Sequence, residues 1–187
     1  MDIYLIRHTQ TDTPTGLCYG QTDVGLAANF RDEFIKTRQK LPALRPDCRV
    51  YSSPLTRCAE FASLLFHQVH NDDRLLELNF GDWENCPFDS LDAEVVRDWT
   101  DNFVSVGPPN GESFTQLCER VGAFWQDLLL TDAEQVVLVT HAGVIRALLA
   151  HVLQLPLANA FKFKVDMGSV HKLQHINDYT FVHFLNH

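Results

Sequence analysis

The clearest signal for the fold is the segment Gln135-Val136-Val137-Leu138-Val139-Thr140-His141-Ala142-Gly143. Its first part is a continuous apolar run, which predicts a strand over 135–140 that is buried on both faces of a sheet. The following residues, 144–153, predict a helix that Pro156 ends. A buried strand that leads directly into a helix is typical of an α/β domain, and it places His141 at the carboxyl end of the strand.

The beginning of the chain repeats this pattern. Ile3 to Ile6 is a short β-branched and aromatic run that predicts a buried strand, and Arg7 and His8 follow it before a polar, Gly/Pro-rich loop over 9–25. In open α/β sheets, ligands bind outside the carboxyl ends of the strands. We therefore expect Arg7 and His8 to lie close to His141.

A third junction of the same kind lies between these two. Arg49 to Tyr51 predicts a short strand, and Ser53 followed by Pro54 predicts a helix in which Ser53 is the N-cap and Pro54 the first helical residue. This junction brings Arg57 to the same edge of the sheet.

The rest of the chain completes an alternation of strands and helices. We expect helices within 27–41, near 91–103 and after a capping box at Ser113 and Gln116, and late strands over 163–173 and 179–185. The alternation predicts a three-layer α/β sandwich with a mostly parallel central sheet. Residues 1–187 are expected to form a single domain in which about 75–110 is a cap-like insertion.

Charge and composition exclude several classes of protein. The chain has 15 Lys and Arg against 24 Asp and Glu, a net charge of −9, so we expect neither nucleic-acid nor membrane-surface binding. We find no apolar run of about 18 residues and no export pattern at the N-terminus. The five cysteines are scattered, which predicts free thiols, a cytoplasmic location and no structural metal site. The sequence predicts no oligomeric state.

The residues expected at the sheet edge suit a phosphate ester. Arg7 and Arg57 are planar, permanently charged donors, and the helix after His141 offers free N–H groups at its first turn. Each of these residues alone has an ordinary structural explanation, whereas their coincidence at one edge predicts a phosphoryl site. The expected partner is a small phosphorylated metabolite, bound at a local positive site on an acidic protein.

Four segments in the same order and context resemble the histidine phosphatase superfamily, also called the phosphoglycerate mutase-like family. The segments are Leu5-Ile6-Arg7-His8-Thr9-Gln10-Thr11, Tyr51-Ser52-Ser53-Pro54-Leu55-Thr56-Arg57-Cys58, Leu76-Glu77-Leu78-Asn79-Phe80-Gly81-Asp82-Trp83-Glu84 and Val139-Thr140-His141-Ala142-Gly143. The resemblance covers most of the chain and implies a phosphoglycerate mutase-like fold.

The resemblance also implies a two-step hydrolysis. His8 would attack phosphorus and form a phosphohistidine, which water then hydrolyses. Arg7, Arg57 and His141 would stabilise the charge on the phosphoryl oxygens without a metal or other cofactor. Glu77 would protonate the leaving group, with Glu84 as the alternative carboxylate.

The expected substrate-binding residues are Arg7, Arg57, His141, Ala142, Gly20 and Gln21. Thr9 and Gln10 stand where the family usually has Gly and Glu, and Pro14 stands where it usually has Asn. These departures fall in the loop that follows the nucleophile.

Within the superfamily, the segment Cys18-Tyr19-Gly20-Gln21-Thr22-Asp23 and the small size resemble the α-ribazole phosphatase branch. This resemblance implies removal of phosphate from α-ribazole 5′-phosphate, or from its cobamide counterpart, in cobalamin synthesis. Phe80, Trp83, Phe88 and Trp99 in the insertion would then stack on a benzimidazole-like base, or alternatively form a small core.

Three other functions stay open at this point. The first is a broad-specificity small-molecule phosphatase. The second is a phosphoglycerate mutase-type enzyme, which the short length disfavours. The third belongs to another class, a catalytically silent member that binds a phospho-ligand or a protein.

Overall fold

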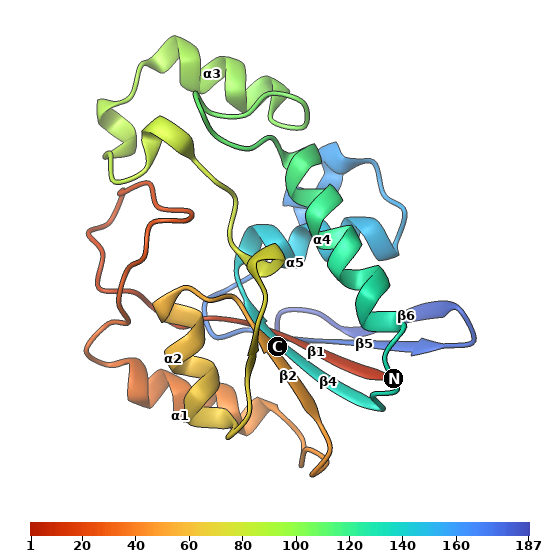
Figure 1. Ribbon diagram of the computed structural model, residues 1–187. Helices are drawn as coiled ribbons and strands as arrows, with labels where there is room; N and C mark the ends of the chain where they lie inside the picture. The colour runs from red at the N-terminus through yellow and green to blue at the C-terminus, as the bar shows by residue number, and fades with distance from the viewer.

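The computed structural model describes residues 1–187 and contains a six-stranded sheet with helices on both faces (Figure 1). The strands are β1 (Asp2–Arg7), β2 (Arg49–Ser52), β3 (His70–Asn71), β4 (Gln135–Thr140), β5 (Val170–Ile176) and β6 (Tyr179–Phe184). Their order is β3-β2-β4-β1-β5-β6; the first four strands in this order are parallel, and β5 and β6 are antiparallel to their neighbours. The predicted α/β class with a mostly parallel sheet is confirmed.

Five α-helices and four short 3₁₀ helices connect or extend the strands. The α-helices are α1 (Phe30–Lys40), α2 (Thr56–Leu65), α3 (Ala93–Asn102), α4 (Phe114–Leu129) and α5 (Ala142–Val152). The 3₁₀ helices are η1 (Asp73–Leu75), η2 (Gly81–Trp83), η3 (Phe88–Ser90) and η4 (Leu157–Lys162). None of these helices is long and apolar enough to span a membrane.

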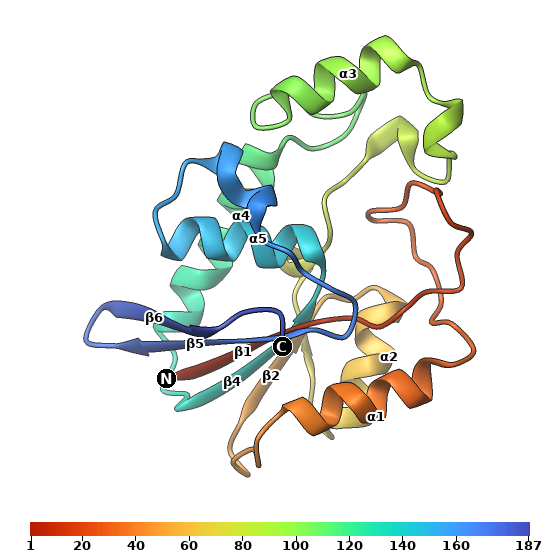
Figure 2. The ribbon, with the colours of Figure 1, turned by 180° about the vertical axis from the view of Figure 1, so that it is seen from behind.

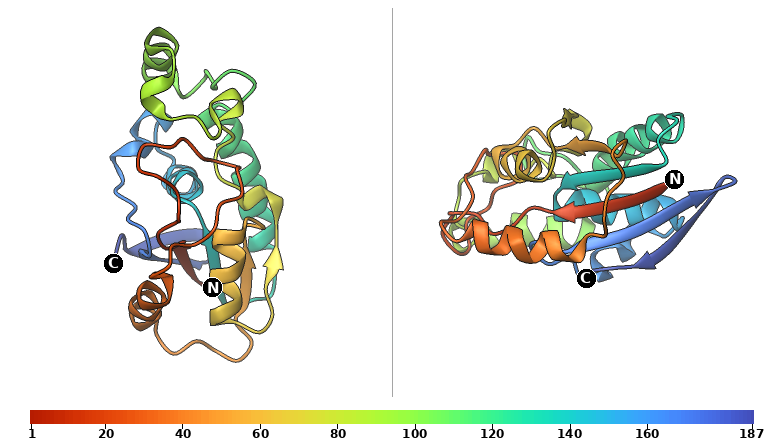
Figure 3. Two further views of the ribbon diagram at one scale, coloured as in Figure 1. Left: turned by 90° about the vertical axis from the view of Figure 1, so that its left-hand side faces the viewer. Right: turned by 90° about the horizontal axis from the view of Figure 1, so that it is seen from below.

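The alternation of side chains along the central strands produces the three layers. Ile3 and Leu5 of β1 are fully buried in a cluster with α4 and α5, whereas Tyr4 and Ile6 belong to a second cluster with α1 and α2. Figures 2 and 3 show the two helical layers on opposite sides of the sheet. Because both faces are covered, the middle residues of β1 and β4 are apolar and buried, whereas the edge strand β6 alternates exposed and half-buried residues.

Several local predictions are confirmed residue by residue. The predicted strand 135–140 is β4, with every residue buried. Ser113 caps α4 as expected: its Oγ accepts from the N–H of Gln116 at 3.3 Å, and Gln116 Oε1 accepts from the N–H of Ser113 at 2.8 Å. The capping box and the continuous apolar run are both patterns of residues close together in the chain, so the sequence alone identifies them.

The predicted start of α2 is wrong. The helix begins at Thr56, not at Pro54, and its N-cap residue is Leu55. The carboxylate of Asp23 accepts from the backbone N–H and the hydroxyl of Thr56, each at 2.7 Å. The carboxylate of Asp23 therefore caps the N-terminus of α2. Ser53 lies outside this helix, at the edge of the sheet.

The predicted strand 163–173 is also wrong in its first half, because β5 begins at Val170. The preceding residues form a loop whose carbonyl groups accept hydrogen bonds from side chains. Val165 O accepts from Arg7 at 2.7 Å, and Gly168 O accepts from Thr37 at 3.1 Å and from Lys40 at 3.0 Å. Apolar composition predicted a strand here, but the carbonyl oxygens of Val165 and Gly168 accept hydrogen bonds from side chains.

The segment expected to be an insertion, about 75–110, carries η2, η3 and α3, and α3 lies far from the sheet (Figures 1 and 2). The predicted helix near 91–103 is α3, which Asp92 caps through its side chain. Gly81, with φ of 54°, packs against the backbone of 109–111, where a Cβ would lie 2.2 Å from Pro109 O. This glycine contact ties the two ends of the segment together.

Candidate active site

Three strand ends bring the predicted residues together at one edge of the sheet. β1 ends in Arg7 and is followed by His8, β2 leads to Ser53, and β4 is followed by His141. The rings of His8 and His141 lie 5.2 Å apart, centroid to centroid, at an angle of 64°. His8 is 3% exposed, and His141 and Arg57 are fully buried.

His8 is held in one orientation and one tautomer. Its Nδ1 donates to the carbonyl oxygen of Thr9 at 2.7 Å, because a carbonyl can only accept. The proton is therefore on Nδ1, and Nε2 keeps a free lone pair. Burial lowers the pKa of His8 to about 3, and the positive charges of Arg57 and Arg7 add to this effect. The ring is neutral at physiological pH.

His141 has the opposite tautomer. Arg57 Nε donates to His141 Nδ1 at 3.3 Å, so Nε2 carries the proton and donates to Ser53 Oγ at 2.8 Å. Burial, together with the nearby His8, Arg57 and Arg7, holds the pKa of His141 well below its usual value. Ser53, predicted only as a helix cap, is thus part of the site.

Arg57 fixes the loop that follows the nucleophile. Its terminal nitrogens donate to Thr22 O at 2.9 Å and to Gly20 O at 2.5 Å, and its guanidinium lies 5.4 Å from the ring centroid of Tyr19. This loop therefore closes over the buried arginine. Its position depends on the bidentate geometry that Arg provides and Lys does not.

Two buried donors at the site have no partner. Arg7 donates from NH1 to Val165 O, but its Nε is buried without a hydrogen bond, and the same holds for Thr9 Oγ1. Buried polar groups in native proteins are nearly always paired. Thr9 thus places a hydroxyl next to His8 at the position where the resemblance led us to expect Gly, and Gln10 lies exposed on the surface.

Glu77 lies against the N-terminus of α5. Its Oε2 accepts from the N–H of Gly143 at 3.1 Å and its Oε1 from the N–H of Leu78 at 3.0 Å. A Cβ at Gly143 would lie 2.2 Å from Glu77 Oε1, so only glycine allows this approach. Ala142, the first residue of α5, is buried beside it, and its N–H has no intrahelical acceptor.

Glu84, the alternative carboxylate, has a different environment. Its oxygens accept from the backbone N–H groups of Gly20, Gln21, Thr22 and Phe80 at 2.8–3.0 Å. Burial pushes the pKa of Glu84 up, but the hydrogen bonds from Thr22 and from these N–H groups outweigh it and hold the pKa below its usual value. Glu84 therefore stays ionised and organises the loop.

The predicted binding residues Gly20 and Gln21 lie in the loop that Glu84 organises. The N–H of each donates to Glu84, and Gln21 Nε2 donates to Glu77 O at 3.1 Å. A Cβ at Gly20 would lie 1.9 Å from Leu78 O, so glycine permits close approach of two backbones. Their role as substrate ligands stays a prediction.

A small cavity of about 80 Å³ lies directly beside Glu77. Gly143, Arg146 and Phe161 contribute to its walls. Arg146 donates from Nε to Phe163 O at 3.1 Å and packs 5.0 Å from the ring centroid of Phe161. Neither Arg146 nor Phe161 was predicted; the only signal for Arg146 is its position one helical turn after Gly143.

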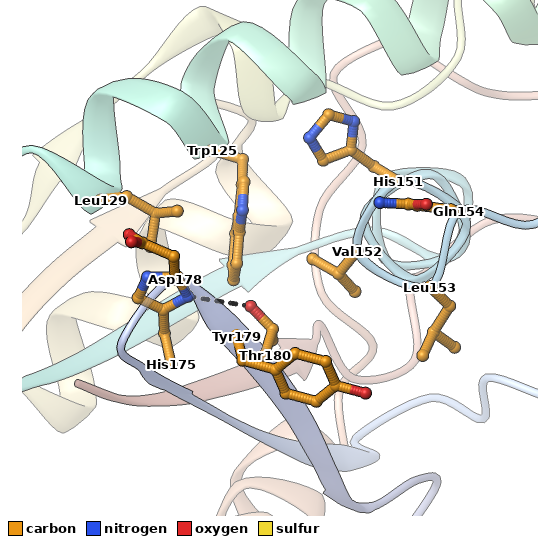
Figure 4. A pocket seen from close by; sticks show the side chains of 10 residues that line it. All are labelled: Trp125, Leu129, His151, Val152, Leu153, Gln154, His175, Asp178, Tyr179 and Thr180. Atoms are coloured by element: carbon orange, nitrogen blue, oxygen red, sulfur yellow. Dashed lines mark hydrogen bonds between the residues drawn. The ribbon is translucent and has the colours of Figure 1, made fainter.

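A larger hollow of about 410 Å³ lies elsewhere, between the ends of α4 and α5 and the β5–β6 hairpin (Figure 4). Trp125, His151, His175 and Tyr179 are among its lining residues. His175 O pairs with the amino group of Met1, at the start of β1, whereas His8 follows the end of that strand. None of the predicted site residues lines this hollow.

Known proteins resemble this chain over most of its length. Residues 3–187 match the family model described as the histidine phosphatase superfamily (branch 1). The chain is 31% identical over 177 residues to the adenosylcobalamin/α-ribazole phosphatase of Salmonella typhimurium, covering 90% of this chain and 87% of the relative. It is 30% identical over 174 residues to the glucosyl-3-phosphoglycerate phosphatase of Mycobacterium tuberculosis, covering 84% and 77%.

The fold of the chain is also similar to that of a solved structure. The α-ribazole phosphatase from Shigella flexneri superposes with a TM-score of 0.91 at 28% identity, covering 100% of this chain and 96% of that one.

Proposed function

The chain belongs to the histidine phosphatase superfamily, and from this membership and the geometry of its site we propose that it hydrolyses a phosphomonoester through a phosphohistidine at His8. One observation carries the proposal. His8 Nδ1 is committed to Thr9 O at 2.7 Å, which leaves a neutral Nε2 lone pair as the nucleophile beside His141.

In the first step, His8 Nε2 attacks phosphorus and the bond from phosphorus to the ester oxygen breaks. Arg7 and Arg57 stabilise the charge on the non-bridging oxygens. The Nε2–H of His141, which donates to Ser53 Oγ in the unliganded site, shares its hydrogen with a phosphoryl oxygen when the substrate is bound. The unpaired donors Arg7 Nε and Thr9 Oγ1 support this placement, because phosphoryl oxygens can accept from both. Ala142 N–H at the start of α5 adds a further donor.

Glu77 gives its proton to the leaving alkoxide in this step. In the second step it takes a proton from water, the water oxygen bonds to phosphorus, and the bond to His8 Nε2 breaks. Phosphate leaves and His8 is neutral again. We assign this role to Glu77 because it borders a cavity and accepts only two hydrogen bonds, whereas the oxygens of Glu84 accept five.

We further propose α-ribazole 5′-phosphate, or its cobamide counterpart, as the substrate. The relatives named above support this choice, since one curated relative and one close structural neighbour are α-ribazole phosphatases. The partner would thus be a small phosphorylated metabolite used in cobalamin synthesis, and the protein would act in the cytoplasm.

A quenched-turnover experiment tests the chemistry. Protein incubated with ³²P-labelled substrate and denatured in alkali should retain label that acid releases, as expected for a phosphohistidine. The label should be absent in His8→Ala and unaffected by EDTA. Equal labelling of His8→Ala would refute the assignment of the nucleophile.

A substrate screen tests the rest of the proposal. α-Ribazole 5′-phosphate should give the highest kcat/KM among esters that include phosphoserine, glucosyl-3-phosphoglycerate and 3-phosphoglycerate. Conversion of 3-phosphoglycerate to its 2-phospho isomer would instead indicate a mutase, and a flat profile a broad-specificity phosphatase. Binding without any turnover would indicate a catalytically silent protein.

A further inference from the structure

We propose that the cavity between α3 and η4, lined by Trp99, Thr100, Phe103 and Phe161, binds the planar aromatic base of the substrate and thereby selects the leaving alcohol. The cavity has a volume of about 260 Å³. This inference rests on the proposed phosphatase function, and it names the part of the substrate that the catalytic residues do not touch.

The composition of this cavity favours an aromatic ring. Three of its four lining side chains are aromatic, and none of the four is charged. Trp99 of α3 and Phe103, the C-cap residue of that helix, are four positions apart, and because Phe103 still has helical backbone angles the two lie on the same face. Phe161 of η4 faces them, with its ring 4.9 Å from that of Phe103. A flat ring can stack or meet these rings edge to face.

The cavity shares one wall with the smaller cavity beside Glu77. Phe161 lines both this cavity and the smaller one beside Glu77. Glu77 in turn contacts Gly143, two residues after His141. A substrate whose phosphoryl group lies at His8 can therefore extend past Glu77 with its alcohol portion and reach Phe161 with its far end.

The size of the cavity also limits the ligand. Pockets that enclose a whole drug-sized ligand have volumes of about 300–1,000 Å³. A volume of about 260 Å³ therefore suits one ring system, not a complete nucleotide-like molecule. A fused bicyclic base attached to a phosphorylated sugar fits this division: the base binds at α3, and the sugar lies beside Glu77.

Trp99 provides a second indication. Its indole Nε1 is buried and has no hydrogen-bond partner, although buried donors are rarely left unpaired. The rest of the ring packs edge to face against Phe80 and Trp83, with centroids 5.9 and 5.4 Å away. One side of Trp99 thus belongs to a small aromatic core, as one of the two sequence interpretations had it, while the residue also lines the cavity.

The test compares two substrates that differ only in the base. α-Ribazole 5′-phosphate and D-ribose 5-phosphate present the same primary phosphate ester to His8, but the second has no aromatic ring. We expect the wild type to prefer the first. In Phe161→Ala, the ratio of the two kcat/KM values should fall about tenfold, since stacking of a base on one aromatic side chain contributes at about this level. Phe161 is 47% exposed but packs against the buried Phe114, so the thermal stability of the variant is measured alongside its kinetics.

A second variant fills the cavity instead of emptying it. Thr100 is exposed on α3, and Thr100→Trp should lower the same ratio by blocking the base. Leu153→Ala, in the separate hollow of Figure 4, is the matched control and should leave the ratio unchanged. A proportional loss on both substrates in Phe161→Ala and Thr100→Trp would overturn the inference, and so would a wild type that does not prefer the base.

A binding measurement separates this inference from the proposed function. Unphosphorylated α-ribazole, titrated calorimetrically, should bind the wild type about tenfold more tightly than Phe161→Ala, whether or not the protein turns over any ester. Binding with this difference but without turnover refutes the phosphatase and keeps the base site. Turnover of both esters with equal binding to wild type and variant refutes the base site alone.

Discussion

The sheet edge around His8 and the aromatic cavity under α3 are built in opposite ways. At the edge, His8 is 3% exposed, His141 and Arg57 are fully buried, and hydrogen bonds fix all three side chains. In the cavity, Phe161 is 47% exposed, and its ring meets that of Phe103 edge to face and lies against the guanidinium of Arg146. The fold therefore preorganises the side chains at the sheet edge through hydrogen bonds. The cavity at α3 and η4 instead offers a mainly apolar surface.

The two regions also differ in how the chain supplies them. The edge is assembled from three neighbouring strand ends, so its geometry follows from the sheet register. The cavity is assembled from α3 and η4, which lie outside the sheet. Changes at the edge should therefore affect every substrate, and changes in the cavity should affect only some.

The largest effect is expected for Glu77. Glu77→Gln keeps the shape and removes the transferable proton, so kcat should fall about 10²–10⁴-fold for both α-ribazole 5′-phosphate and ribose 5-phosphate. Steady-state kinetics on the two esters measure this. Glu84→Gln is the matched control: it should weaken the loop over 20–22 and lower thermal stability, with a smaller loss of kcat. A larger loss of kcat in Glu84→Gln than in Glu77→Gln would instead identify Glu84 as the general acid.

The second effect concerns stability against pH. Burial lowers the pKa of His171 to about 4 and that of His8 to about 3, while unfolded histidines titrate near pH 6.5. Below pH 6.5 the unfolded chain takes up protons that the folded chain does not. The free energy of unfolding should therefore fall as pH falls, by about 1.4 kcal/mol per pH unit for each such histidine.

Urea unfolding at pH 6, 5.5 and 5 checks this slope. His171→Asn should reduce it by about one histidine's share, since His171 is not among the reacting groups but is fully buried against Ser169. Phe161→Leu, in the cavity that contains no titrating side chain, should leave the slope unchanged. Identical slopes in wild type and His171→Asn would contradict the assignment of a neutral buried ring.

The smallest effect is expected for Ser53. Its hydroxyl accepts from His141 Nε2 at 2.8 Å, and loss of one neutral hydrogen bond is worth about 0.5–1.5 kcal/mol. Ser53→Ala should thus lower kcat by roughly two- to tenfold with little change in KM, and Ser53→Thr should restore most of it. The ratio between the two esters should stay constant. A change in that ratio would mean that the residues at the sheet edge also contribute to selection of the leaving alcohol.

Much of the sheet edge was predictable because its signals are local. The apolar run before His141, the pair Arg7-His8 after a short strand, and the capping box of α4 each depend on residues a few positions apart. The family resemblance then supplied roles for these positions and for Glu77. The structure brings all of them to one place.

The errors and omissions have one physical cause, which is contact between residues far apart in the chain. Asp23 moves the start of α2 to Thr56 across 33 positions, and the side chain of Arg7 holds Val165 across 158. Glu84 is the alternative to Glu77 as the acid, and its hydrogen bonds to the loop over 20–22 are contacts that the sequence did not reveal. No periodicity or spacing encodes such pairs.

By itself, the sequence determined the class of fold, the strand ends and the types of residue that a phosphoryl site requires, because hydrophobic period and local capping act within one element. Only the tertiary structure showed which ring nitrogen of each histidine carries the proton, which backbone N–H groups donate to Glu77 and to Glu84, and that Phe161 joins Trp99 and Phe103 around one cavity. These features depend on distances and burial between elements, and the packing of the whole chain sets them.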